Sequence, residues 1–509
     1  MSNADGSNGD ARLSIAVTEG RNADRPRWGL RLGSSLGALL LLWLILLRVN
    51  ATDLFFDEAQ YWTWSLEPAF GYYSKPPLIA WVIGLATETC GASEFCIRLP
   101  SPLLHTATAF AVFALGAQLY DARVGFWSAL AFATLPGISL SSGIISTDAP
   151  LLLFWALALC GLIGLLKTSR IWPGVLLGIA LGLGLNAKYA MAFFIPCLAL
   201  YLALTQEHRR LLKDGRLLAA LLFGATLIAP NLAWNAANGF ATIAHTASNA
   251  DWGASLFNPR NALEFLGAQF GVFGPILFSA LIAITVRAWK RGVPAEDRFL
   301  LFFALPVLAI VTVQAFLSHA NANWAAVAYV SATTLVMATL IRDLSWRWLR
   351  ASFGVHLTVL ATLGLGVAFA GQLTLPFAGD FLARSLGWRE VALVTHAVLE
   401  DGRRRGSPYS SIVTVERALT AELLYYLRDD PTPVLAWRGG DPPQNHYQLK
   451  RPFVKGTAEP ALLVALRPDL DGVLTQFARV EPLGTREIPA GAGKARRITF
   501  YRLAGFKVD

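Results

Sequence analysis

The chain has 509 residues, of which 54% are hydrophobic and only 15% are charged. Soluble domains carry about 25% charged residues. This composition and the mean hydropathy of +0.47 therefore exclude an ordinary soluble enzyme and indicate many segments that cross about 30 Å of hydrocarbon. The net charge of +9 would favour nucleic-acid binding in a soluble protein. Here the basic residues lie in short loops between apolar runs, where membrane topology accounts for them.

A short polar segment precedes the first apolar run. Residues 1–27 are rich in Asn, Asp, Gly and Arg and lack the apolar core of a signal peptide, so they are predicted to form a disordered cytoplasmic tail. Eleven apolar runs follow, and each is predicted to be a spanning helix. Two of them are short and separated only around Lys188, so one or two crossings fit that region. The runs cover residues 29–49, 102–120, 124–142, 149–166, 171–187, 189–204, 216–234, 270–288, 299–317, 324–341 and 353–374.

The basic residues of the short loops predict the orientation. With the N-terminus in the cytoplasm, nineteen Lys and Arg residues up to residue 352 fall on the cytoplasmic side and five on the far side. Cytoplasmic loops are enriched in Lys and Arg, so the bias supports this placement. An odd number of helices then places the C-terminal region outside the cytoplasm. The five far-side residues are Arg48, Lys75, Arg98, Lys188 and Arg260.

Two far-side loops are long, at 48–101 and 235–269. The first is rich in Trp, Tyr and Phe, which favour the membrane interface, so short helices lying along the surface are predicted there. The same loop contains Cys90 and Cys96. These two residues could form a disulfide in an oxidising compartment, or remain two buried thiols.

The composition changes after residue 374, and residues 375–509 are predicted to form a small α/β domain. Strand, helix and strand patterns alternate there, as in a sheet covered by helices. The region contains no glycine-rich phosphate loop. The predicted strands are 410–415, 433–437, 461–466 and 495–503, and the predicted helix is 416–427.

Ionisable groups near a membrane are costly, so those in the far-side loops are functional candidates. They are the Asp57-Glu58 pair in DLFFDEAQYW, Lys75 in GYYSKPPLIAW and Asp148 in ISTDAPLLLFW. Each has a structural alternative: the acidic pair could begin a helix, Asp148 could be an N-cap, and Lys75 could extend to lipid headgroups. Because all of them lie on one face of the membrane, they are predicted to converge. A carboxylate would then accept a proton, and the lysine would neutralise a departing lipid phosphate.

These motifs resemble those of the polytopic GT-C glycosyltransferases that use polyprenyl-phosphate sugars, in families 39 and 83. The group includes protein O-mannosyltransferases, the lipid A aminoarabinose transferase and rhizobial lipopolysaccharide galacturonosyltransferases. The resemblance covers about residues 30–345 and rests on the order and spacing of the motifs, with weaker support from LGWRE and AELLYYL in the C-terminal region. The motifs are the Asp-Glu pair, YYSKPPLIAW (72–81), IRLPS (97–101), STDAPLLLF (146–154) and NANWAAVAY (321–329).

The resemblance implies a role for each matching residue. Asp57 matches the family's essential carboxylate, a base or acceptor-positioning group, and Lys75 matches a lysine near the donor phosphate. Residues 28–374 would form the catalytic GT-C domain, with inversion at the anomeric carbon and with no cofactor or metal. The implied catalytic residues are Asp57, Glu58 and Asp148, and the implied substrate-binding residues are Lys75, Tyr72, Tyr73 and Lys188.

The sequence therefore predicts an α-helical polytopic inner-membrane glycosyltransferase with a periplasmic active site and a small C-terminal α/β periplasmic domain. Its partners would be an undecaprenyl-type phosphate sugar, membrane lipids and a periplasmic acceptor such as lipid A or another envelope glycan, and not nucleic acid. One alternative is protein O-glycosylation by the same chemistry. Another is a lipid-linked sugar transporter, which should show internal repeats or charges deep in several helices; the sequence shows neither.

Overall fold

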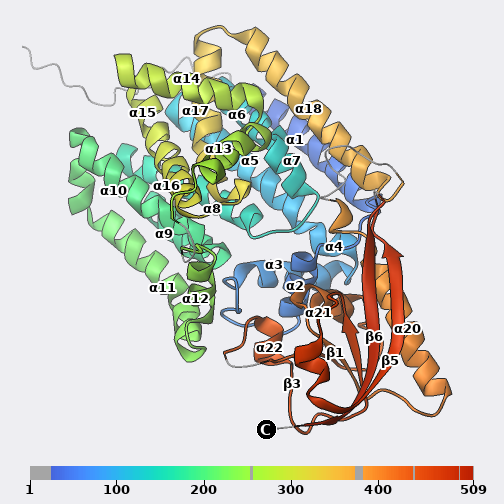
Figure 1. Ribbon diagram of the computed structural model, residues 1–509. Coiled ribbons are helices and arrows are strands. Elements are labelled where there is room, and N and C mark those ends of the chain that lie inside the picture. Colours follow the sequence, from blue (N-terminus) through green and yellow to red (C-terminus); the bar gives the residue numbers. More distant parts are fainter. Residues whose placement is uncertain (1–24, 253–255, 373–381, 440–441, 492, 508–509) are drawn as a thin grey trace, which may run out of the picture.

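The computed structural model describes residues 25–252, 256–372, 382–439, 442–491 and 493–507 (Figure 1). A large bundle of helices is followed by a smaller part in which helices pack on a β-sheet, with the long strands β5 and β6 at its edge. The predicted fold class, a helical polytopic protein with a small C-terminal α/β part, is confirmed.

Each of the eleven apolar runs is helical. Several are interrupted by a proline or a short 3₁₀ segment, so one run corresponds to two consecutive elements. In chain order the elements are α1 (Arg25–Arg48), α5 (Pro100–Leu119), α6 (Ala122–Thr134) with α7 (Pro136–Ser142), α8 (Asp148–Lys167), α9 (Trp172–Ala187), η2 (Tyr189–Phe193) with α10 (Phe194–Leu204), α11 (Gly215–Ala237), α14 (Pro275–Arg291), α15 (Ala295–Phe302) with α16 (Leu305–Leu317), α17 (Ala328–Arg342) and α18 (Trp346–Ala368).

Length and hydropathy identify the candidate membrane spans. Within the described ranges, six helical segments are long and apolar enough to cross a membrane, and eight if each bent pair counts as one span. The bends lie between α6 and α7 (58°) and between α13 (Pro259–Val272) and α14 (117°), where Pro136 and Pro275 begin the second helix. Further apolar helices are shorter, among them α9 and α17. Eleven crossings therefore stay a prediction.

The outer helices present apolar side chains on the surface of the bundle. Leu41 of α1, Leu222 of α11 and Val313 of α16 are each more than half exposed. Many large apolar side chains are exposed in the same way on helices that pass the length and hydropathy test for spans, and such side chains suit contact with lipid. The chain is thus a multi-pass membrane protein.

The two long loops contain short helices. The first holds α2 (Phe56–Ser65), α3 (Leu78–Cys90) and α4 (Glu94–Arg98), and the second holds α12 (Ala241–Ser248) and most of α13.

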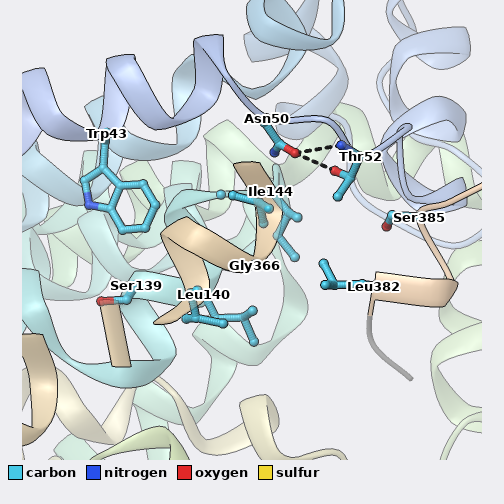
Figure 2. A pocket seen from close by; sticks show the side chains of 12 residues that line it. Trp43, Asn50, Thr52, Ser139, Leu140, Ile144, Gly366, Leu382 and Ser385 are labelled. Atoms are coloured by element: carbon cyan, nitrogen blue, oxygen red, sulfur yellow. Dashed lines mark hydrogen bonds between the residues drawn. The ribbon is translucent and has the colours of Figure 1, made fainter. Parts of the chain in front are cut away.

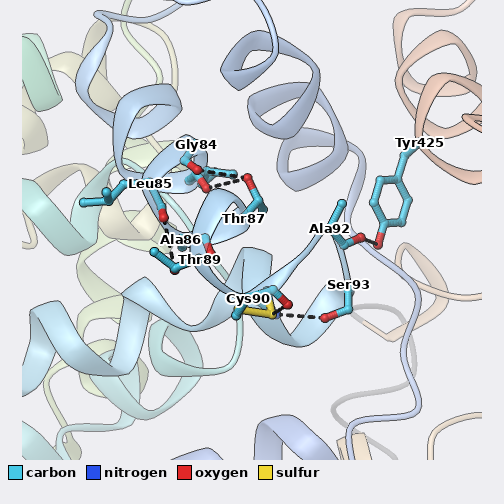
Figure 3. Close-up of a disulfide and its surroundings, with 11 residues drawn as sticks. Gly84, Leu85, Ala86, Thr87, Thr89, Cys90, Ala92, Ser93 and Tyr425 are labelled. Atoms are coloured by element: carbon cyan, nitrogen blue, oxygen red, sulfur yellow. Dashed lines mark hydrogen bonds between the residues drawn. A yellow bond between two sulfur atoms is a disulfide. The ribbon is translucent and has the colours of Figure 1, made fainter.

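The sulfur atoms of Cys90 and Cys96 are bonded to each other, which confirms the disulfide hypothesis (Figure 3). The bond joins the end of α3 to α4 across a turn in which Gly91 has a φ of 86°, a conformation that favours glycine.

The C-terminal sheet has six strands in the order β3-β2-β1-β4-β6-β5. The strands β1 (Ser411–Thr414), β2 (Val434–Trp437) and β4 (Ala461–Ala465) are parallel and buried on both faces, and β6 (Ala495–Phe506) pairs antiparallel with β4. These four strands and α21 (Arg417–Tyr426) match the predicted elements. Further elements of this part are α20 (Trp388–Arg404), α22 (His446–Lys450), β3 (Pro452–Phe453), α23 (Asp471–Leu474) and β5 (Phe477–Pro489).

The strands β3 and β5 were not predicted, for different reasons. The strand β3 has only two residues. The strand β5 lies at the edge of the sheet and pairs with β6 alone, so most of its side chains are exposed and the sequence shows no apolar alternation.

The α/β part packs directly on the first far-side loop, with α21 beside α2. The Tyr426 hydroxyl accepts a hydrogen bond from the Leu54 N–H at 2.9 Å, and the hydroxyls of Tyr447 and Thr63 lie 2.9 Å apart. Asp53 accepts a 2.8 Å hydrogen bond from the Trp388 N–H. These contacts place residues of the C-terminal part next to the Asp57-Glu58 pair.

Candidate active site

The helix α2 directs Asp57 and Glu58 to different partners. Successive residues of an α-helix point about 100° apart, so one side chain faces the α/β part and the other faces the helical bundle. Asp57 Oδ1 accepts a 2.8 Å hydrogen bond from Arg417 Nη1 at the start of α21, and each of these side chains is 35% exposed. Among the described residues, Asp57 Oδ2 has no hydrogen-bond partner.

Glu58 is buried and held by three segments of the chain. Its carboxylate lies 2.8 Å from Arg98 Nη2, and both side chains are only 1% exposed. It also accepts hydrogen bonds from the N–H groups of Phe55 and Ile145, each at 2.9 Å. Arg98 in turn donates to the carbonyl oxygen of Asp53 at 2.7 Å. Glu58 thus fastens α2 to α4 and to the segment that leads into α8.

Asp148 is the first residue of α8, whose N-cap is Thr147, so the N-cap alternative for Asp148 is wrong; its carboxylate has two side-chain partners. Lys188 Nζ lies 2.6 Å from Asp148 Oδ1, and Asn323 Nδ2 donates to Oδ2 at 2.6 Å. Lys188 caps the C-terminus of α9, and Asn323 lies in the 3₁₀ helix η4 (Ala322–Ala325). Three helix ends therefore meet on one face of the bundle.

Lys75 lies on the wall of a cavity of about 360 Å³ that Lys188 also lines. Within the described part of the chain, the Lys75 ammonium has no ion-pair or hydrogen-bond partner. Burial lowers the pKa of Lys75, and the positive charge of Lys188 lowers it further, while Asp57 and Asp148 oppose the shift. A partly buried, unpaired ammonium with a second lysine nearby favours an anion.

The rest of the cavity wall is divided between polar and apolar groups. Thr246, Asn249 and Gln314 contribute polar atoms. Ile310 of α16 is exposed and belongs to a candidate membrane span, so the cavity adjoins the surface that suits lipid. The large apolar lining residues are Phe193, Ile310, Val311 and Trp324.

The two tyrosines of the YYSKPP motif are anchored by their hydroxyl groups. Tyr72 is buried, stacks on Trp64 with ring centroids 4.7 Å apart, and donates to the Trp64 carbonyl oxygen at 2.9 Å. Burial raises the pKa of Tyr72 to about 12. The Tyr73 hydroxyl donates to the Pro443 carbonyl oxygen at 3.0 Å. Neither residue lines the cavity at Lys75, and both hold the loop that carries this lysine.

The structure brings four of the predicted residues together and buries two others. Lys75 and Lys188 share the cavity, Asp148 pairs with Lys188, and Asp57 lies within electrostatic range of Lys75. Glu58 and Tyr72 are buried in the surrounding structure.

Sequence reasoning did not name Asn323, Trp324 or Arg417 as site residues. Asn323 and Trp324 belong to the NANWAAVAY motif, so the motif itself was the available signal. Arg417 lies 360 positions from its partner Asp57, and nothing in its own sequence surroundings marks it.

Another cavity lies where α1 ends against α7 and α18, and it is lined by Trp43, Asn50 and Leu140 among others (Figure 2). Its volume is about 40 Å³, which holds about one water molecule. Asn50 Oδ1 accepts hydrogen bonds from the Thr52 N–H and hydroxyl at 2.9 and 2.8 Å. This cavity is too small for a sugar, whereas the larger cavity is lined by the predicted residues Lys75 and Lys188, which makes it the candidate site.

Comparison with known proteins relates the chain to membrane glycosyltransferases. Residues 74–234 match the family described as dolichyl-phosphate-mannose-protein mannosyltransferase. The lipid A galacturonosyltransferase RgtD of Rhizobium johnstonii is 35% identical over 410 residues, which cover 80% of this chain and 85% of that protein. An undecaprenyl phosphate-alpha-4-amino-4-deoxy-L-arabinose arabinosyl transferase of Pseudomonas aeruginosa is 28% identical over 238 residues, 45% of this chain and 41% of that protein.

A solved structure supports the fold. ArnT of Cupriavidus metallidurans, bound to undecaprenyl phosphate, aligns with a TM-score of 0.61 at 15% identity, and the alignment covers 95% of this chain and 99% of that chain. The similarity therefore includes both the helical bundle and the sheet-bearing part.

Proposed function

We propose, from the premise that this chain belongs to the GT-C membrane glycosyltransferases of the ArnT and protein mannosyltransferase family, that it transfers a sugar from a polyprenyl-phosphate donor to lipid A or lipopolysaccharide. The chain is a multi-pass inner-membrane glycosyltransferase. We infer the acceptor from the relative RgtD, whose name specifies lipid A. We infer the lipid part of the donor from the undecaprenyl phosphate bound in the ArnT structure.

The observation that carries the proposal is the unpaired ammonium of Lys75 in a cavity whose lining includes large apolar residues. A donor phosphate placed there would neutralise Lys75, with Lys188 nearby as a second positive charge. The apolar residues beside Ile310 suit the first isoprene units of the lipid, and the exposed side chain of Ile310 lies where the rest of the lipid would leave the protein. A soluble nucleotide sugar has no lipid chain that these apolar residues could bind.

In the proposed reaction, Asp57 acts as the base. An acceptor hydroxyl attacks the anomeric carbon from the face opposite the phosphate, and Asp57 takes its proton on Oδ2. The bond between the anomeric carbon and the phosphate oxygen breaks, polyprenyl phosphate leaves with the electron pair, and the configuration inverts. Lys75 stabilises the second negative charge that develops on the leaving phosphate.

The remaining predicted residues are proposed to position these groups. Both carboxylate oxygens of Asp148 are engaged, so Asp148 holds Lys188 at the cavity and takes no proton. Glu58, Tyr72 and Tyr73 fix the loop from 48 to 101. The proposal sets the site and the α/β part in the periplasm, in line with the excess of Lys and Arg in the loops predicted to be cytoplasmic.

A protein acceptor is the second candidate, and one observation bears on it. The segment that matches the protein mannosyltransferase family, 74–234, includes Lys75, Asp148 and Lys188 but not Asp57. The shared segment therefore covers the proposed donor side. It supports a polyprenyl-phosphate donor without favouring a protein as the acceptor.

The relatives differ in the charge of the sugar. RgtD is named for a galacturonosyl group, which carries a carboxylate, whereas the P. aeruginosa relative is named for an amino sugar. The family thus accommodates sugars of either charge on one fold.

The proposal is tested with the purified full-length protein in liposomes, supplied with polyprenyl-phosphate sugars and with lipid A. Mass spectrometry should find lipid A heavier by one sugar, and lipid A from a deletion strain should lack that sugar. An unchanged lipid A in the deletion strain, together with a glycoprotein that loses its sugar, would replace the lipid acceptor by a protein one.

A further inference from the structure

Arg417 brings a guanidinium from the α/β part to Asp57, the proposed base. It is the first residue of α21, and its Nη1 donates to Asp57 Oδ1 at 2.8 Å and to Gln60 Oε1 at 2.7 Å. Gln60 lies one turn after Asp57 on α2 and is buried. The guanidinium carbon also lies 4.9 Å from the centre of the Phe56 ring. Three residues of α2 thus fix the direction of this side chain.

Only one nitrogen of the guanidinium is used by these contacts. Within the described residues, Arg417 Nε and Nη2 have no acceptor, and the side chain is 35% exposed. These two nitrogens form the edge of a guanidinium that binds a carboxylate with two parallel hydrogen bonds. Arg417 therefore holds the proposed base with one nitrogen and leaves a carboxylate-binding edge beside it.

This edge is linked to the proposed phosphate site by a short series of side chains. Gln60 accepts from Arg417 and donates to Ser74 Oγ at 3.5 Å, and Ser74 precedes Lys75 in the chain. Lys75 is also within electrostatic range of Arg417. Two cationic groups linked in this way, Lys75 and Arg417, suit a ligand that carries two anionic groups.

We propose that the donor sugar is a uronosyl group and that Arg417 binds its carboxylate through Nε and Nη2. This inference rests on the proposed function, in which Lys75 binds the donor phosphate. In a pyranosyl uronate the phosphate is attached to C1 and the carboxylate to C5, on either side of the ring oxygen. Binding both anions would place C1 between Lys75 and Arg417, next to Asp57. An amino sugar would instead meet a positive charge at this position.

The test compares two polyprenyl-phosphate donors that differ only in a carboxylate or a hydroxymethyl group at C5. Wild-type protein should prefer the uronosyl donor. In Arg417→Gln the ratio of kcat/KM for the uronosyl donor to that for the neutral donor should fall by about 10- to 100-fold, as expected when a charge-assisted hydrogen-bonded pair is lost. The fall should lie mainly in KM, and Arg417→Lys should retain part of the preference.

A matched control and a binding measurement accompany the kinetics. Arg405→Gln removes an arginine of the same part of the chain that pairs with Asp401 near the end of α20, and it should leave the ratio unchanged. Uronose 1-phosphate should raise the Tm of the wild type more than the neutral hexose 1-phosphate does, and Arg417→Gln should abolish this difference. Size-exclusion chromatography verifies that each variant is folded.

Three outcomes would overturn the inference. If Arg417→Gln lowers activity with both donors equally, Arg417 only positions Asp57. If the loss appears only with a phosphorylated acceptor, the anion at Arg417 belongs to the acceptor. If the wild type prefers the neutral donor, the sugar assignment is wrong although polyprenyl-phosphate transfer stands. Absence of transfer from either donor would instead contradict the proposed function, and the Tm comparison would still decide whether Arg417 binds a carboxylate.

Discussion

Lys188 Nζ lies 2.6 Å from Asp148 Oδ1, although 40 positions separate the two residues in the chain. The pair forms because α8 begins at Asp148 and the neighbouring helix α9 ends just before Lys188, so antiparallel packing brings these ends to the same level. The pair leaves Lys75, across the same cavity, as the ammonium with no carboxylate partner in the described structure. This difference between the two lysines underlies the proposed binding of a donor phosphate.

Asp57→Asn should lower kcat by about 10²- to 10⁴-fold, because it preserves size and removes the proposed base. The measurement is transfer by purified variants that remain monodisperse. Glu67→Gln serves as the control, since Glu67 is an exposed residue just after α2 that pairs with Arg451 away from the cavity. If kcat of Asp57→Asn stays near the wild-type value, Asp57 is only a carboxylate at the start of a helix and is not the base.

Lys75→Met should lower kcat by about 10²- to 10³-fold, by analogy with removal of a group that stabilises an oxyanion. The wild type should also lose activity in alkaline solution. The pKa of Lys75 is lowered from its ordinary value of 10.5, so the charged form that binds phosphate is lost as the pH rises through that lowered pKa. Lys75→Arg stays charged and should keep kcat/KM to higher pH. If kcat/KM of the wild type and of Lys75→Arg falls at the same alkaline pH, a group other than Lys75 causes the loss.

Arg98→Met should destabilise the protein by about 3–5 kcal/mol, because it leaves the buried Glu58 carboxylate without its partner. A lower Tm in detergent would report the loss, and the double variant Glu58→Gln with Arg98→Met should recover part of it. Arg451→Gln, which breaks an exposed pair with Glu67, should cost less than about 1 kcal/mol. If Arg98→Met lost all turnover at an unchanged Tm, the pair of Glu58 and Arg98 would act in the chemistry and not in the stability of the fold.

Thiol labelling checks the disulfide. The chain has four cysteines, of which Cys160 and Cys197 are free and buried. In denaturant without reductant, maleimide should therefore add to two thiols, and after reduction it should add to four. Mass spectrometry counts the adducts. Four adducts without prior reduction would show that Cys90 and Cys96 are thiols in the protein.

A reporter fusion tests the orientation. A phosphatase that is active only outside the cytoplasm should be active when fused after the C-terminal residue, and inactive when fused after Arg291 at the end of α14. The motivation is the excess of Lys and Arg in the loops assigned to the cytoplasm. The opposite pattern would mean that the number of crossings is even, with residues 171–204 as the first region to re-examine.

The sequence alone determined the secondary structure of the bundle and most of the sheet. Each apolar run is helical and each predicted strand is present, because spanning length, apolar content and turn residues are properties of short segments. The motifs also identified Lys75 and Lys188, which share a cavity, and Asp148, which pairs with Lys188. The order of the motifs could identify these residues because all of them lie at helix ends or in loops on one face of the bundle.

Only the tertiary structure decided what each ionisable group contacts. Asp57 and Glu58 are adjacent in the sequence, yet one meets Arg417 from the α/β part and the other is buried against Arg98. These partners lie 360 and 40 positions away. A pair at such a separation forms only when whole elements pack together, and local propensity and hydropathy carry no signal of that packing. The proposed positioning role of Glu58 and the proposed carboxylate site at Arg417 both rest on that packing.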